Sequence, residues 1–456
     1  MVFSSLSFLV FLLPLTVILY FICRNRVWRN TVLLLASLFF YAWGEPKLLV
    51  LMVAAALAAY LGGLVIGGTK GFIRKAVYIL TLLLLLSNLF IFKYLNLISD
   101  TLRFSLKQIA LPIGISFYTF QILSYVIDLY RGEIKVQKNF FHLLLYVSFF
   151  PQLIAGPIVR YQTIEQEITA RCESMRDVAD GLRRFVLGLS KKVLIANQVA
   201  VVAEHLFSSN ASGAGAYWLA ALAFTLQIYF DFSGYSDMAI GLGRMFGFHF
   251  LENFNYPYVS CSVTEFWRRW HISLSSWFRD YVYIPLGGSR RKRSRNILNL
   301  LIVWALTGLW HGASWSFLLW GLYFGLVLIL EKYLLAKLLK KLPKAVGWLY
   351  TMSIVVIGWV IFDLTDFSAL GRTLFAMARF APTDWRTLIS QDASILFSAL
   401  FLLPGIIFSF PVAGKLLRSE KTGAVILKNM LCIVLLLLCL AMLLGKNYNP
   451  FIYFRF

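Results

Sequence analysis

The sequence predicts an all-α polytopic membrane protein, and three observations support this fold class. Hydrophobic residues make up 60% of the 456 positions and charged residues only 14%, whereas a soluble domain carries about 25% charged residues. Long apolar runs such as 76–98 match the length of a membrane helix and lack the alternation of a barrel strand. Positive charge gathers in alternate loops between these runs, as in a chain that crosses a bilayer many times.

About 11–12 transmembrane helices are expected, with additional re-entrant and interfacial helices. The first apolar run is followed by basic residues and has no small-residue cleavage site, so we interpret it as a retained span and not a signal peptide. The expected spans are 5–23, 30–44, 48–66, 76–98, 112–130, 185–206, 217–232, 297–313, 315–331, 346–362, 395–411 and 428–445.

The distribution of basic residues predicts the orientation in the membrane. Loops on one side of these spans contain 32 of the 43 Lys and Arg residues, against eight on the other side. The positive-inside rule makes the richer side cytoplasmic, so both termini of this multi-pass plasma-membrane protein are expected outside. The net charge of +22 is thereby explained by topology, and no nucleic-acid partner is predicted.

One apolar segment does not have the pattern of a simple span. Residues 139–161 are interrupted by Pro151, Gly156 and Pro157. Proline removes a backbone donor and clashes with the preceding turn, so a broken or re-entrant segment is expected. Non-helical backbone at membrane depth is tolerated only where protein buries it or water lines it, which indicates a nearby cavity.

The region 231–295 also departs from a plain bundle. Asp231, Ser233 and Asp237 are expected to follow an apolar span. Further on, aromatic residues alternate with arginines as in an amphipathic helix at the membrane interface. These residues are Trp267, Trp270, Trp277 and Tyr281 on one side and Arg268, Arg269 and Arg279 on the other.

A basic cluster closes this region and permits two interpretations. In the first it anchors the topology beside anionic membrane lipid, and in the second it binds a phosphate-bearing donor that enters from the cytoplasm. The cluster consists of Arg290, Arg291, Lys292, Arg293 and Arg295.

Two of the five histidines are candidates for chemistry. His311 lies in the apolar stretch TGLWHGASW, where Gly308 and Gly312 permit close backbone approach. A neutral imidazole in a protein-lined cavity suits a general base that takes a proton from a hydroxyl. His271, in FWRRWHISL, is the second candidate, although a hydrogen-bonded structural histidine is the alternative at both positions. The other three, for which no chemistry is predicted, are His142, His205 and His249.

Metal and nucleotide chemistry are weakly supported by the sequence. The two candidate histidines are forty residues apart, which is not a ligand spacing, and no HExxH, Walker A or GxSxG pattern occurs. We therefore predict no metal site and no bound cofactor.

Several longer motifs resemble the membrane-bound O-acyltransferase (MBOAT) family. They are FPQLIAGPIVRY, QIYFDFSGYSDMAIGLGRMFGF, ENFNYPY, EFWRRWHISLSSWFRDYVYIPLGG and TGLWHG. The resemblance extends over nearly the whole chain. It is closest to the alginate O-acetylase and peptidoglycan O-acetyltransferase type, and more distant to the D-alanyl transfer proteins. It implies one MBOAT domain over 1–456, with N-terminal spans (1–138), a catalytic core (139–332) and C-terminal spans (333–456) around a cytoplasmic funnel.

The resemblance also implies a site and a reaction. His311 corresponds to the active-site histidine of the family and His271 to its second active-site position. The donor would be acetyl-CoA or another acyl thioester, or an acyl carrier, used at the cytoplasmic face as a substrate. The expected substrate-binding residues are Asp231, Asp237, Asn253, Trp267, Arg268, Arg269 and Trp310.

The acyl group would then cross the membrane for O-acetylation of a cell-surface polysaccharide or peptidoglycan, with an extracytoplasmic SGNH-type transferase or another acceptor protein as partner. Tyr453, in the ending FIYFRF, resembles the acyl-accepting tyrosine of a small partner protein in D-alanylation and is a candidate acceptor or partner contact, with an interfacial aromatic anchor as the alternative.

Two other functions remain open at this point. A transporter or flippase would use His311 and Asp237 as a proton relay, and inverted-repeat symmetry, which we do not find, would favour it. A lipid or protein O-acyltransferase would keep the chemistry and change the acceptor.

Overall fold

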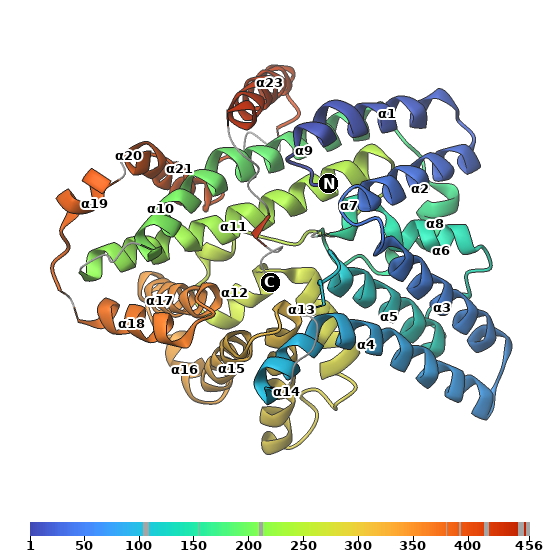
Figure 1. Cartoon of the computed structure of the whole chain (residues 1–456), viewed down its shortest axis with the longest axis horizontal. Coiled ribbons are helices and arrows are strands. Elements are labelled where there is room, and N and C mark those ends of the chain that lie inside the picture. The colour runs from blue at the N-terminus through green and yellow to red at the C-terminus, as the bar shows by residue number, and fades with distance from the viewer. Residues whose placement is uncertain are drawn as a thin grey trace. The chain divides into compact units, whose positions relative to one another are not determined.

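The computed structural model describes the chain except for residues 104–108, 155, 209–212, 380, 392–393, 415–418, 446–450 and 453–456. Helices are its only regular elements, and the described residues contain no strand (Figure 1). The predicted all-α fold class is confirmed. Contacts between residues divide the chain into two compact units, namely Met1–Phe185 with Tyr235–Leu251, and Val186–Gly234 with Glu252–Phe456.

The first unit contains the N-terminal helices, and two long helices contribute to both units. The long helices are α9 (Met175–Ser190) and α11 (Ala214–Met245). The first unit contains η1 (Ser7–Leu12), α1 (Leu13–Ile22), α2 (Arg26–Ala42), α3 (Leu49–Gly68), α4 (Gly71–Leu102), α5 (Ile115–Arg131), α6 (Phe140–Ser148), α7 (Phe150–Leu153) and α8 (Tyr161–Ala170).

The second unit contains both candidate histidines. Its elements are η2 (Lys191–Ala196), α10 (Asn197–Ser208), η3 (Pro257–Val259), α12 (Val263–Arg269), α13 (Ile272–Phe278), η4 (Arg279–Tyr283), α14 (Arg293–His311), α15 (Trp315–Leu330), η5 (Glu331–Leu335), α16 (Ala336–Leu339), α17 (Lys344–Asp363), α18 (Phe367–Ala378), α19 (Trp385–Gln391), α20 (Ser394–Ala399), α21 (Leu402–Phe408) and α23 (Thr422–Leu444).

Each of the twelve expected spans coincides with helix, and the chain is a multi-pass membrane protein. Six helices in the described part of the chain are long and apolar enough to cross a bilayer. Two further apolar helices, Ser7–Ile22 and Ile395–Phe408, are shorter, so the number of crossings remains a prediction. The six are Leu49–Gly68, Gly71–Leu102, Met175–Ser208, Trp315–Leu339, Lys344–Asp363 and Thr422–Leu444.

The predicted break in segment 139–161 is confirmed. Helix α6 stops at Ser148, and only the single turn of α7 follows before an extended stretch. Side chains from neighbouring helices bond the interrupted backbone, since the Ser37 hydroxyl accepts from the Phe150 N–H at 3.1 Å and the Tyr146 hydroxyl bonds the Val159 carbonyl at 3.0 Å. The non-helical backbone is thus buried in protein and hydrogen-bonded, which is the condition for its tolerance in an apolar environment.

Helix α11 is longer than the sequence indicates. It continues past residue 232, so Asp231 and Asp237 lie within the helix and do not follow it. Gly234 lies inside the helix and permits close packing, because a Cβ atom there would lie 2.7 Å from the Gly188 carbonyl oxygen. The glycine therefore serves a helix–helix contact inside the second unit.

The expected interfacial helix is two short helices, α12 and α13, separated by a bend at Trp270 and His271. Their aromatic side chains are buried: Trp267 is 8% exposed and packs 4.7 Å from the ring of Trp304, while Trp270 packs 4.7 Å from that of Trp359. The alternation of aromatic and basic residues correctly indicated an amphipathic segment. Its apolar face, however, packs against α14 and α17 of the same protein.

A buried ionic cluster connects the loops of the first unit. Glu173 pairs with Arg26 and Arg29, each at 2.6 Å, and accepts a short hydrogen bond from the Tyr20 hydroxyl. Arg171 donates to the Phe246 carbonyl at 2.9 Å. Burial alone would raise the pKa of Glu173, but the hydrogen bonds from Arg26 and Tyr20 and the charges of Arg26 and Arg29 lower it to about 2. This carboxylate therefore stays charged and holds the α1–α2 turn against the segment before α9.

Candidate functional site

His311 is the last residue of α14 and is 5% exposed. Its ring contacts Trp320 at 5.0 Å and Phe362 at 5.4 Å between centroids. Glycine makes this position possible, because a Cβ atom on Gly308 or Gly312 would overlap Phe317 of α15. The close backbone approach predicted for the two glycines is confirmed, and it places the imidazole inside an aromatic cluster.

His271 occupies the bend between α12 and α13. Its backbone has φ +44°, a left-handed conformation that histidine adopts more readily than most residues. The side chain is 1% exposed, and Nδ1 lies 3.1 Å from Oδ1 of Asn253. The backbone around the bend is fixed as well, since the Ile272 N–H donates to the Asn253 carbonyl at 3.0 Å. Burial lowers the pKa of His271 to about 3, so the ring is neutral at physiological pH.

Glu331, at the end of α15, holds the first turn of α12. Its carboxylate is 3% exposed and accepts the Val263 N–H at 2.7 Å, the Thr264 N–H at 2.8 Å and the Thr264 hydroxyl at 2.6 Å. A negative charge at a helix N-terminus satisfies unpaired N–H groups and opposes the positive end of the helix dipole. The position of Trp267 and Arg268 on α12 is therefore tied to α15.

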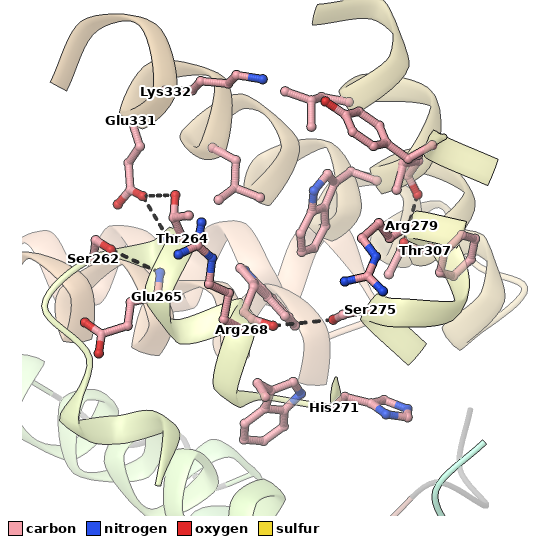
Figure 2. A pocket seen from close by; sticks show the side chains of 18 of the residues that line it. Ser262, Thr264, Glu265, Arg268, His271, Ser275, Arg279, Thr307, Glu331 and Lys332 are labelled. Carbon is pink, nitrogen blue, oxygen red and sulfur yellow. Dashed lines mark hydrogen bonds between the residues drawn. The ribbon is translucent and has the colours of Figure 1, made fainter. Parts of the chain in front are cut away.

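A single cavity of about 770 Å³ in the second unit is lined by both His271 and His311. Figure 2 shows Lys332 and Glu331 at one end of the drawn lining and His271 at the other. Arg268, Arg279, Ser275 and Thr307 lie between these ends. The cavity thus extends from Lys332 and Glu331 to a buried neutral histidine, and its walls are largely aromatic and aliphatic.

The cavity lining carries more positive than negative charge. It contains Arg268, Arg279, Lys332, Lys340, Glu265 and Glu331. The two carboxylates have structural tasks: Glu331 caps α12, and Glu265 pairs with Arg269 at 2.9 Å. Arg279 pairs with Asp280 at 2.7 Å and Lys332 donates to Asn296 at 2.6 Å, whereas Arg268 and Lys340 have no ion-pair partner in the described part of the chain.

The structure brings some of the expected site residues together and separates others. The cavity is lined by Trp267, Arg268, His271 and His311. Asn253 does not line it, but its Oδ1 lies 3.1 Å from Nδ1 of His271. Trp310 packs 5.9 Å from His271 without lining the cavity, and Arg269 points to Glu265. The exposed cluster Arg290, Arg291, Lys292, Arg293 and Arg295 does not line it either.

The two aspartates of α11 have other partners. Asp231 is 1% exposed, pairs with Lys192 at 2.7 Å and accepts the Ile452 N–H at 2.7 Å. Asp237 belongs to the first unit and pairs with Arg184 at 2.9 Å. Neither lines the cavity. Tyr453 lies outside the described residues, although the preceding Ile452 is buried beside Asp231.

The remaining histidines do not line this cavity. His249 is exposed and bonds Glu167 at 2.8 Å, and His142 and His205 are half-buried. No group of three or more His, Cys, Asp or Glu side chains within the described ranges is arranged to bind a metal ion.

Sequence reasoning did not single out several polar cavity residues, among them Glu331, Lys332 and Lys340. The two lysines were counted only as loop charge, but they are eight residues apart, a spacing that places them on one helix face with Ala336 between them. That periodicity was the available signal. The capping role of Glu331 depends on a contact 68 residues away and left no local signal.

The chain is similar in sequence to known membrane-bound acyltransferases. The model of the MBOAT, membrane-bound O-acyltransferase family, matches residues 132–377. The chain is 41% identical to a probable alginate O-acetylase of Azotobacter vinelandii over 93% of this chain and 87% of the relative. It is 35% identical to a peptidoglycan O-acetyltransferase of Helicobacter pylori over 83% and 80%, respectively. A teichoic acid D-alanyltransferase of Bacillus subtilis is 30% identical to the chain over 46% of this chain and 56% of the relative.

Proposed function

The chain belongs to the membrane-bound O-acyltransferase family, and from this membership we propose that it transfers an acetyl group from a cytoplasmic thioester donor, acetyl-CoA or an acyl carrier, across the membrane. The acetyl group would serve O-acetylation of an extracytoplasmic cell-surface polysaccharide or peptidoglycan. The relatives that are named as alginate and peptidoglycan O-acetyltransferases support this acceptor class. The activity of the chain as a membrane O-acyltransferase is the premise, and the donor, route and acceptor are the proposal.

One observation supports this proposal best, namely that one cavity contains both histidines and has a lining with more positive than negative charges. Arg268 and Lys340 are cations without an ion-pair partner in the described residues, and such groups attract the phosphates of a thioester donor. The aromatic and aliphatic walls suit an acyl chain and its pantetheine arm and exclude water from the thioester.

In the proposed reaction His311 is the general base. It takes the proton of the acceptor hydroxyl, and the oxygen attacks the thioester carbonyl carbon. As the tetrahedral intermediate collapses, a new C–O bond remains, the C–S bond breaks, and the leaving thiolate takes the proton from His311. His271 orients the reacting groups or stabilises charge. Positioning in a site that excludes water supplies most of the rate enhancement.

The proposal includes an orientation and a partner. The excess of basic loops on one side favours a cytoplasmic mouth and two external termini. An external SGNH-type transferase or another acceptor protein would finish the polymer modification, and Tyr453 is the candidate residue of this chain to receive the acyl group or contact that partner. Membrane lipid surrounds the apolar helices.

Two alternatives differ in how well the geometry fits them. A lipid or protein acceptor would use the same cavity and histidines. A proton-relay transporter is less well supported, because Asp237 pairs with Arg184 and does not line the cavity that contains His311.

The test is transfer of labelled acetyl from acetyl-CoA by purified protein in vesicles, with the donor at the cytoplasmic face and the external partner present. Wild type is compared with His311→Ala and His271→Ala. We expect transfer by wild type and its loss in a folded His311→Ala protein. Undiminished transfer in that variant would make His311 structural, and absence of transfer by wild type with the partner present would refute acetyl-CoA as the donor.

A further inference from the structure

The contacts of Asn253 determine which nitrogen of the His271 ring carries the proton. Oδ1 of Asn253 accepts the Ser273 backbone N–H at 3.2 Å and the Ser273 hydroxyl at 2.8 Å. A backbone N–H can only donate, so the atom that it bonds must be the amide oxygen and not the amide nitrogen. The same oxygen lies 3.1 Å from Nδ1 of His271. Nδ1 must therefore be the donor in this contact.

This assignment leaves Nε2 as the free lone pair of the ring. In a neutral imidazole one nitrogen is protonated and the other is an acceptor. The low pKa of His271 keeps the ring neutral, and Nε2 makes no hydrogen bond to the described residues although it is buried. The ring is fixed from the side as well, by an edge contact with Phe232 at 4.6 Å between centroids.

We propose that Asn253 is a positioning residue that holds His271 as the neutral Nδ1–H tautomer, so that Nε2 acts only as a hydrogen-bond acceptor. His271 then orients the hydroxyl of the acyl acceptor, and it does not stabilise the negative charge that develops on the thioester oxygen, because that task needs an N–H donor. This role rests on the proposed acyl transfer and selects one of the two tasks considered there for His271. No proton is transferred to His271, and its Nε2 only accepts a hydrogen bond from the hydroxyl that His311 deprotonates.

The tautomer can be measured without any activity assay. Full-length protein carrying ¹⁵N-labelled histidine is examined by NMR at neutral pH, and the His271 signals are assigned by their absence in His271→Asn. We expect a protonated Nδ1 and an unprotonated Nε2, and loss of this uniform state in Asn253→Leu, which keeps the side-chain size but cannot accept. A protonated Nε2 in wild type would overturn the proposal even if acetyl transfer were intact.

The kinetic test compares variants around the same oxygen. Asn253→Leu should lower kcat about a hundredfold with little change in KM for the donor, as expected for misplacement of a reacting group. Asn253→Asp, which keeps an acceptor oxygen, should recover at least about tenfold of that loss. Ser273→Ala is the matched control, because it removes the hydroxyl bond to Oδ1 and the 3.4 Å contact of that hydroxyl with Nδ1 but keeps the bond between Asn253 and His271, and its kcat should stay within about threefold of wild type.

Equal losses in Asn253→Leu and Ser273→Ala, or no recovery in Asn253→Asp, would show that Asn253 is merely structural. If wild type transferred no acetyl group at all, the proposed donor would be wrong, while the NMR result would still decide the tautomer. The failure of the tautomer assignment and the failure of the proposed function are therefore distinguishable.

Discussion

The Glu331 carboxylate accepts the backbone N–H of Val263 at 2.7 Å across 68 positions of sequence. Through this bond, and those from Thr264, one buried side chain at the start of η5 fixes the first turn of α12, which carries Trp267 and Arg268. The cavity wall therefore depends on a carboxylate that has no chemistry of its own in the proposed reaction.

Replacing this carboxylate should weaken the fold and the site together. Glu331→Gln keeps one acceptor oxygen but turns an NH₂ group toward backbone donors, so we expect a loss of about 1–3 kcal/mol in the free energy of unfolding. Thr264→Val removes only the hydroxyl bond at 2.6 Å and should cost less. Thermal unfolding in detergent measures both. A Glu331→Gln protein as stable as wild type would contradict the capping role.

The cations of the cavity should determine the affinity for the donor. In the Arg268→Gln, Lys340→Gln double variant we expect KM for acetyl-CoA to rise about tenfold or more with kcat little changed, because a hydrogen bond to a charged group contributes about 1.5–3 kcal/mol. The matched control removes the same charge from the exposed cluster by Arg290→Gln and Arg291→Gln. Initial-rate kinetics measure KM for acetyl-CoA in both double variants. An equal rise in KM in the two would mean that donor affinity depends on general surface charge.

The buried ion pair of Asp231 should be needed for stability and for the position of the C-terminal segment. Asp231→Asn removes the buried carboxylate that pairs with the charge of Lys192, and breaking a buried ion pair from one side costs about 3–5 kcal/mol. It also weakens the bond to the Ile452 N–H, so proteolysis near the C-terminus should become faster. Asp237→Asn, which affects the more exposed pair with Arg184, is the control for charge removal from the same helix. Unchanged unfolding and cleavage in Asp231→Asn would refute this role.

The sequence was sufficient to predict what depends on local pattern. The apolar runs predicted the helices, and the prolines predicted the break in 139–161. The glycines beside His311 predicted the close contact with α15. These features follow from rules that act over a few residues, such as helix length, the missing proline N–H and the absence of a Cβ atom.

What the sequence could not predict depends on distant contacts. The burial of Trp267 is set by α14 and α15, so the same amphipathic pattern fits a lipid interface equally well. The pairing of Asp231 with Lys192 was not predicted, because Lys192 lies 39 residues earlier and nothing in the local pattern indicates the pair. The proximity of Asn253 and His271 likewise requires the backbone bonds that join their two segments.

The ionic cluster of the first unit predicts a specific pH dependence. The pKa of Glu173 falls from 4.5 to about 2 on folding, so its stabilisation is complete above pH 4.5 and is lost as the pH falls through about 2. The shift corresponds to about 3 kcal/mol. Glu173→Gln should therefore destabilise the protein at neutral pH and flatten its acid unfolding curve between these limits, because the remaining arginines lose their partner. Glu133→Gln is the control, since Glu133 is 47% exposed and lies 3.9 Å from Arg131. Identical acid curves for wild type and Glu173→Gln would refute the assignment.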